Sequence, residues 1–135
     1  MDGLVFVFNV GIQMTKNYFT AKEEACKCCG QGRLVSDFRE KLNKARELAD
    51  VPFFLTSAFR CEQHNREVGG TENSAHLAGL AVDIKCTDAW TRFKIIHALL
   101  SVGFQRIGIG HTFIHVDDDI TKPRGVIWDY YSKKA

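Results

Sequence analysis

A carboxylate and an imidazole, each in the middle of a short apolar stretch, are the side chains of this sequence best placed to do chemistry. The stretches are LAVDIK at residues 80–85 and FIHVD at residues 113–117, both typical of β-strands. Because successive side chains of a strand point to opposite faces, the aliphatic residues face the core, and Asp83 and His115 face the other way. If the two strands share a sheet, Asp83 and His115 project from one surface.

His76 adds a second imidazole, because it lies in a polar loop seven residues before Asp83, near enough to fold back over the strand. A buried carboxylate without a partner is costly, so Asp83 needs a cation or strong hydrogen-bond donors. Two imidazoles and one carboxylate fit a catalytic zinc ion, which takes three protein ligands and keeps a fourth position for water. The alternatives are a solvated loop histidine and an aspartate paired with Lys or Arg.

An apolar stripe at helical spacing predicts a helix over residues 36–50, with Ser36 as its N-cap. The stripe consists of Phe38, Leu42, Ala45 and Leu48. Two further helices are expected at residues 61–68 and 90–102.

The expected strands follow the same apolar and turn signals. They are residues 53–57, 80–85, 106–109, 112–117 and 126–130, with a polar loop at 71–79. Helices that precede and interrupt a run of strands predict an α+β domain with a small, mainly antiparallel sheet and helices packed on it.

Length and composition are those of one ordinary globular domain, with 135 residues of which 45% are apolar and 25% charged. The net charge is +2 without a basic stripe, so nucleic acid is not an expected partner. Residues 1–14 are predicted to be an N-terminal extension or an edge strand, and residues 15–135 the domain. The apolar run of residues 1–14 is too short for a membrane span and lacks the basic start of a secretory signal, although a targeting role is the alternative.

Five cysteines leave at least one thiol outside any scheme of intramolecular disulfides. Without a clear secretory signal, we expect reduced thiols. The alternative is a structural zinc site, because residues 26–29 (CKCC) contain a C-x-x-C spacing. A second such pair is missing from the sequence, so this site would have to recruit Cys61 or Cys86.

The stretch SAHLAGLAVD at residues 74–83 fits the pattern S-x-H-x-x-G-x-A-x-D, and a His-x-Asp follows at residues 115–117. This combination resembles the zinc D-Ala-D-Ala carboxypeptidase family, which belongs to a wider group with lysostaphin-type peptidases and the hedgehog signalling domain. TSAFRCEQHN at residues 56–65, followed by VGG, is also similar to the family. The beginning and the end of the chain resemble short phage and prophage members, so the resemblance covers about residues 17–131.

The resemblance implies that His76, Asp83 and His115 bind one zinc ion. It also implies that Arg60 contacts the substrate, at its terminal carboxylate, which a guanidinium fork matches with two hydrogen bonds. A surface salt bridge is the alternative role of Arg60. Ser74 is expected to orient a ligand or to bind substrate, unless its hydroxyl only hydrogen-bonds the local backbone.

The sequence departs from the family at the general base, which takes a proton from the attacking water. Some relatives carry Glu three residues before the last His ligand and others His two residues before it, where this chain has Thr112 and Phe113. Asp117, on the same strand face as His115, is the candidate catalytic residue. Its alternative role is to hold an imidazole in place.

These features predict a zinc-dependent peptidase that acts on the peptidoglycan stem peptide as a monomer, either as a carboxypeptidase or as an endopeptidase. We expect it to be made in the cytoplasm and to act on the cell wall, through phage lysis or export by an unknown route. One alternative is a non-catalytic, zinc-containing module of the same fold that binds peptidoglycan or a protein. The other is a structural component of a phage particle with a decayed site.

Overall fold

A five-stranded mixed sheet lies at the centre of the part of the chain that the computed structural model describes, residues 16–133. Its strands lie in the order β1-β2-β4-β3-β5, and each neighbouring pair is antiparallel except the parallel pair β3 and β5. The predicted α+β class with a mainly antiparallel sheet is therefore confirmed. The strands are β1 (Leu55–Ser57), β2 (Ala81–Lys85), β3 (Arg106–Ile109), β4 (Phe113–Asp117) and β5 (Val126–Asp129).

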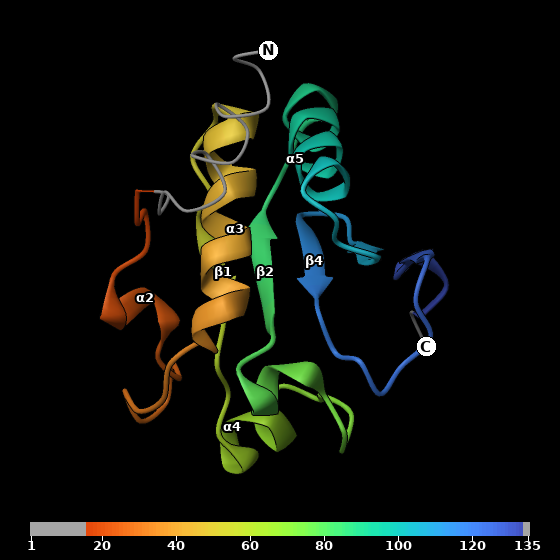
Figure 1. Cartoon of the computed structure of the whole chain (residues 1–135). Helices are drawn as coiled ribbons and strands as arrows, with labels where there is room; N and C mark the ends of the chain where they lie inside the picture. Colours follow the sequence, from red (N-terminus) through yellow and green to blue (C-terminus); the bar gives the residue numbers. More distant parts are fainter. Residues whose placement is uncertain (1–15, 134–135) are drawn as a thin grey trace.

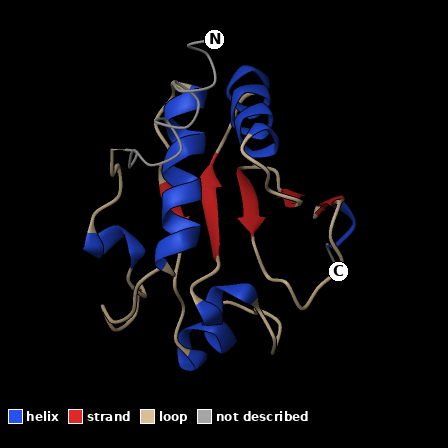
Figure 2. Ribbon diagram, in the orientation of Figure 1, coloured by secondary structure: helices blue, strands red, loops and turns tan. Residues whose placement is uncertain are grey.

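Two long helices, α3 (Ser36–Ala49) and α5 (Ala89–Ser101), lie side by side over one face of the sheet (Figure 1). Figure 2 shows the strands of the sheet beside and partly behind these helices. The shorter elements are α2 (Ala21–Glu24), α4 (Glu62–Glu67) and the 3₁₀ turns η1 (Ala75–Ala78) and η2 (Tyr131–Lys133). Of these, α4 and η1 lie between β1 and β2 in the chain and close to the start of β2 (Figure 1).

The core lies between the sheet and the two long helices, and strand alternation explains its composition. Val82 and Ile84 of β2, with Ile114 and Val116 of β4, are fully buried in this core. The side chains between them therefore point to the other face of the sheet, away from α3 and α5. That second face is free to carry polar groups.

The predicted details of α3 need two corrections. The N-cap is Val35, with no side-chain hydrogen bond, instead of Ser36, which is already helical. Leu48 is 52% exposed, and Ala49 takes the buried place at 3%. Eleven residues bring an ideal helix back to within about 20° of its starting direction, whereas ten leave it about 80° away. Measured from Phe38, Ala49 therefore faces the core and Leu48 does not.

The predicted extension or edge strand at residues 1–14 lies outside the described residues. Within residues 16–133, the earliest member of the hydrophobic core is Phe19. None of the helices in that part of the chain is long and apolar enough to cross a membrane.

Candidate metal centre

Asp83 and His115 are direct neighbours across the antiparallel pair β2 and β4. Both point to the face of the sheet opposite the helical layer, as the alternation of the two strands predicts. The Asp83 carboxylate oxygen Oδ1 lies 2.9 Å from Nδ1 of His115. Strand register thus brings one carboxylate and one imidazole together on a rigid part of the fold.

His76 reaches the same place from η1, a turn that the sequence pattern specifies locally. Ser74 caps the turn, because its hydroxyl accepts a hydrogen bond from the backbone N–H of His76 at 3.2 Å. Gly79 ends the turn in the left-handed region with φ of 73°, a conformation that other residues rarely adopt. Ser74 therefore shapes the backbone that carries His76, which corresponds to the local hydrogen bond foreseen for it.

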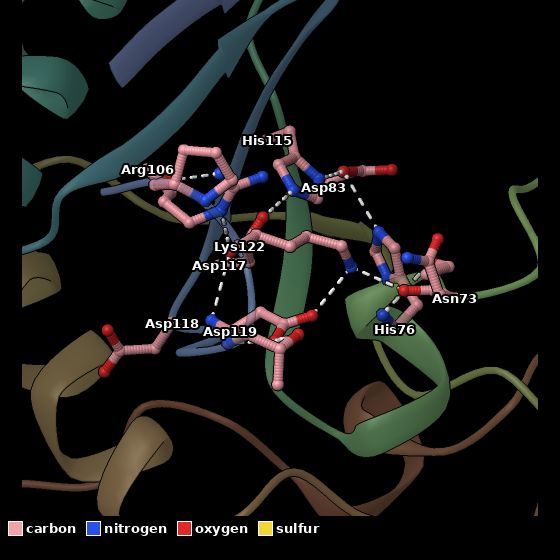
Figure 3. A network of polar contacts seen from close by, with 12 residues as sticks. Asn73, His76, Asp83, Arg106, His115, Asp117, Asp118, Asp119 and Lys122 are labelled. Atoms are coloured by element: carbon pink, nitrogen blue, oxygen red, sulfur yellow. Dashed lines mark hydrogen bonds and ion pairs between the residues drawn. The ribbon is translucent and has the colours of Figure 1, made fainter. Parts of the chain in front are cut away.

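The three predicted metal-binding side chains converge in the structure (Figure 3). Nε2 of His76 lies 3.4 Å from Oδ1 of Asp83, and the potential ligand atoms of all three residues lie within 4.8 Å of one another. His76 and His115 are buried, and the side chain of Asp83 is 15% exposed. A cluster of this kind could hold one metal ion.

Each imidazole is oriented by a second acceptor on its other ring nitrogen. Nδ1 of His76 lies 2.7 Å from the carbonyl oxygen of Ala58, and Nε2 of His115 lies 2.7 Å from Oδ2 of Asp117. An N–H donated to these acceptors leaves Nε2 of His76 and Nδ1 of His115 as lone-pair donors facing Asp83. Histidine ligands of metals are held in this way by carbonyls and carboxylates.

Asp117 is buried and engaged through both of its oxygens. Besides the contact with His115, Oδ1 accepts a hydrogen bond from Nε of Arg106 at 2.7 Å and one from the backbone N–H of Asp119 at 3.1 Å. Burial would raise the pKa of Asp117, but the contacts with His115, Asp119 and Arg106 outweigh burial and lower it. Asp117 is therefore a carboxylate anion that links an imidazole to a guanidinium.

The electrostatics of Asp83 favour its ionised form. Burial would raise the pKa of Asp83, but the contacts with His115 and His76 outweigh it and hold the pKa well below the usual range. For His115 the balance is reversed: burial lowers the pKa, and the hydrogen bonds with Asp117 and Asp83 raise it by more. The ionised carboxylate of Asp83 thus favours a positive charge at the point where the three side chains meet.

Arg60 lies beside this cluster, held by neighbours on both sides. Its Nε donates to the hydroxyl of Ser57 at 3.0 Å, and Nη1 donates to Oδ1 of Asn65 at 3.1 Å. The remaining nitrogen, Nη2, lies 3.5 Å from Oδ2 of Asp83. The guanidinium is therefore fixed at the edge of the centre, with one N–H group turned toward it.

A cavity of about 490 Å³ opens over the cluster, and several of the residues that line it were not predicted to belong to the site. Trp128 of β5 and Tyr130, the residue directly after β5, line it together with Arg106 and Lys122. Figure 3 shows Lys122 reaching from Asp119 toward the backbone of Asn73 across one side of the site. The spacing of Trp128 and Tyr130, two residues apart, indicates that their side chains lie on the same face of the last strand. The pairing of β5 with β3 is what brings that face to the cavity.

Gly108 makes room for the aromatic wall of the cavity. It lies opposite His115 in the β3–β4 pair, and a Cβ atom there would come within 2.8 Å of the Trp128 ring and 2.7 Å of the Tyr130 ring. The two rings consequently pack close to His115, with ring-centroid separations of 5.6 Å and 6.5 Å. Burial also raises the pKa of Tyr130, so its hydroxyl stays protonated at neutral pH.

When the sequence is compared with known protein families, one family model matches it. The family model described as Peptidase M15 matches residues 13–117, which include His76, Asp83, His115 and Asp117. No curated protein matches the chain. Trp128 and Tyr130 lie after the matched segment, so the family match does not include them. Their place in the cavity wall is known from the structure.

Proposed function

The chain belongs to the peptidase M15 family, a group of metallopeptidases, and we propose that it is a zinc-dependent peptidase that cleaves peptide bonds in bacterial cell-wall peptides. The observation that carries the proposal is the meeting of His76, Asp83 and His115 at the floor of an open cavity. Family membership implies a peptide substrate, and the wall peptide is the substrate class favoured by the motif around His76.

The donor set fits zinc in type and in spacing. Ligands at about 2.0–2.2 Å from a tetrahedral zinc ion are separated from each other by roughly 3.3 Å. The distance of 3.4 Å between His76 Nε2 and Asp83 Oδ1 agrees with this value, and the 2.9 Å between His115 Nδ1 and the same oxygen requires only a small opening. Three protein ligands at the floor of a cavity leave a position for water, as catalytic sites require.

The chain's own residues then have separable tasks. His76, Asp83 and His115 would hold the ion, and Ala58 and Asp117 keep the two imidazoles in the correct tautomer and direction. A zinc ion bound there supplies a water acidic enough to act as hydroxide near neutral pH and polarises the scissile carbonyl.

Asp117 is best explained as the residue that positions His115. Its two oxygens are occupied by His115, Arg106 and the backbone of Asp119, and its lowered pKa makes it a weak proton acceptor. Of the two roles foreseen for Asp117, general base and imidazole partner, the contacts support the second.

Arg60 and Tyr130 are placed to act on the substrate. The Arg60 guanidinium, fixed by Ser57 and Asn65, can pair with a carboxylate of the stem peptide, whose charge it matches. Tyr130 lines the cavity and keeps its proton, so its hydroxyl can donate a hydrogen bond to the oxygen on which negative charge develops during attack.

The experiment that tests the proposal is mass spectrometry of muropeptides after incubation of purified peptidoglycan with the zinc-loaded protein. Loss of a terminal D-alanine would identify a carboxypeptidase, and cleavage within the stem or cross-link would identify an endopeptidase. His76→Ala should abolish the products while leaving a folded domain, because the other ligands remain on the sheet. His97→Ala is the matched control, since His97 is exposed on α5, in the layer that covers the other face.

A second candidate function is a zinc-containing binding module of the same fold. The observation that favours it is the content of the cavity, where Asp83 and Asp117 are the carboxylates among the described lining residues and both are engaged. Retention of the protein on insoluble peptidoglycan, with one zinc ion in the centre and intact muropeptides, would support the module. Cleavage that disappears in His76→Ala would support the peptidase.

A further inference from the structure

Four of the five cysteines gather on the side of the molecule where the loop after α2 meets the start of α4. Cys26, Cys28 and Cys29 follow α2, and Cys61 is the N-cap residue of α4. The Sγ atoms of Cys26, Cys28 and Cys61 are separated by 3.6, 3.6 and 3.4 Å, and Cys29 brings all four within 4.8 Å of one another. Each of these cysteines is a free thiol in the structure.

The separations match a tetrahedral thiolate site. Zinc–sulfur bonds of about 2.3 Å place the sulfur atoms of such a site roughly 3.8 Å apart. A disulfide needs sulfur atoms about 2.05 Å apart and joins only two of them, whereas here three sulfurs are mutually close. Four sulfur atoms that all lie within 4.8 Å of one another can share one tetrahedral ion, and a closed set of four cysteines around one ion is typical of zinc.

The surrounding backbone donates hydrogen bonds to the sulfurs, as expected for thiolates that carry negative charge. The N–H of Cys61 donates to Sγ of Cys26 at 3.4 Å, and the N–H of His64 donates to Sγ of Cys61 at 3.3 Å. The loop itself is closed by hydrogen bonds from Cys26 N–H to the Gln31 carbonyl and from Gly30 N–H to the Cys26 carbonyl. These bonds orient the loop so that its cysteines face Cys61.

We propose that Cys26, Cys28, Cys29 and Cys61 bind a structural zinc ion, separate from the centre formed by His76, Asp83 and His115. Four protein ligands leave no position for water, so the ion has a structural role. Cys86, the fifth cysteine, is buried in the core cluster and takes no part. Of the two partners that the sequence left open for the C-x-x-C pair, the structure thus brings Cys61 to it.

A zinc ion bound by these cysteines would link the loop after α2 to the segment that carries Arg60. Cys61 directly follows Arg60, whose backbone N–H donates to the carbonyl of His76 at 3.1 Å. One residue earlier, the N–H of Phe59 donates to the carbonyl of Glu24 at 3.1 Å. A metal at the cysteines would therefore stabilise the backbone that places Arg60 at the cavity, a consequence that rests on the proposed function.

Elemental analysis of the full chain, purified under reducing conditions, tests the proposal by counting metal ions. We expect two zinc ions per chain in the native protein, and one in His76→Ala. X-ray absorption of the zinc remaining in His76→Ala should show four sulfur neighbours at about 2.3 Å. This measurement leaves every cysteine in place, so it does not depend on a cysteine variant that folds.

Substitution of an exposed ligand gives the complementary result. Cys28→Ser should retain one zinc ion, at the cavity, and unfold at a lower temperature, whereas Cys86→Ser should retain both ions. With cobalt in place of zinc, the thiolate-to-metal charge-transfer band should be present in His76→Ala and absent from Cys28→Ser.

Three outcomes would overturn the proposal. They are a sulfur-free environment for the remaining zinc, an iron-loaded cluster, or disulfides among these four cysteines in the freshly reduced protein. If the cavity centre bound no zinc, the native protein would hold one ion instead of two, and four sulfur neighbours around that ion would still support the cysteine site.

Discussion

Both ring nitrogens of His115 contact carboxylates, one that of Asp83 and the other that of Asp117. Its orientation therefore depends on Asp117, a carboxylate whose two oxygens are both engaged by protein partners. Asp117 in turn is anchored by Arg106. Through this chain of contacts, a residue two positions after a proposed metal ligand can influence the centre by orienting His115.

Asp117→Asn tests that explanation. We expect zinc affinity to fall about 10- to 100-fold, the range for loss of a hydrogen-bonded partner of a metal ligand. Turnover should recover when zinc is added in excess, because the reacting groups remain. Zinc titration with activity measured at each concentration separates affinity from turnover. If kcat stays low at saturating zinc, Asp117 is the proton acceptor instead.

Arg60→Lys probes the substrate carboxylate. The positive charge remains, but the planar fork that can bind both carboxylate oxygens is lost. We expect kcat/KM for wall peptides to fall about 10- to 100-fold, equivalent to roughly 1.5–3 kcal/mol for a hydrogen bond to a charged group. Zinc content should be unchanged, and Arg66→Lys, on the exposed side of α4, should behave as wild type. Full activity of Arg60→Lys would assign Arg60 to the fold alone.

The sequence predicted the convergence of His76, Asp83 and His115 because two strands with clear alternation determine their own faces. It gave no role to Trp128, Tyr130, Arg106 or Lys122, since these reach the cavity through the β3–β5 pairing and through a loop. Alternation along a strand gives the face on which each side chain lies, but not the neighbour of that strand in the sheet. The parallel pairing of β5 with β3 is therefore seen only in the structure.

At the level of elements, a buried ion pair joins α2 to α3. Glu24 is fully buried, and its carboxylate accepts hydrogen bonds from Arg39 at 2.6 and 2.9 Å, from Arg33 at 3.1 Å and from the backbone N–H of Leu34 at 3.0 Å. A four-residue helix has little stability of its own, so these contacts hold it in place. The carbonyl of the same residue accepts the N–H of Phe59.

Glu24→Gln should destabilise the protein by about 2–3 kcal/mol, because a charged acceptor is replaced and the two guanidinium groups lose their counter-charge. Urea unfolding at pH 7 measures the difference in free energy of unfolding. Glu47→Gln, an exposed change on α3, is the control and should stay within about 0.5 kcal/mol of wild type. Equal stability of the two variants would contradict the role assigned to Glu24.

The stability difference between wild type and Glu24→Gln should also depend on pH. Burial would raise the pKa of Glu24, but hydrogen bonds from Arg39, Leu34 and Arg33 outweigh burial and lower it below the usual value. A lowered folded-state pKa stabilises the protein above the unfolded-state pKa of about 4.3, and this contribution disappears as the pH falls through the folded-state pKa. The stability gap between wild type and Glu24→Gln should thus be constant from pH 7 to about 5 and shrink below that.

At the scale of the whole described molecule, one face of the sheet packs into the hydrophobic core and the other carries the candidate metal centre. Helices α3 and α5 cover one face, as Figure 1 shows, and the core lies between them and the sheet, whereas the other face carries the cavity with its charged floor. This division follows from the alternation in β2 and β4, where each buried aliphatic residue is followed by a polar or small one. Substitutions in the helical layer should therefore change stability more than metal affinity.

The domain proposed at residues 15–135 should fold without residues 1–14. Its described part contains a five-stranded sheet, the two long helices that cover it and a core whose earliest described member is Phe19, so these layers pack on one another within this range. We expect the chain without residues 1–14 to bind the same amount of zinc and to unfold within about 2 °C of the full chain, as measured by thermal melts with zinc present. Both β1 and β5 are edges of the described sheet, and an added strand at either edge would contribute backbone hydrogen bonds. A fall of several degrees, equivalent to about 1–2 kcal/mol for a chain of this size, would show that residues 1–14 belong to the folded unit.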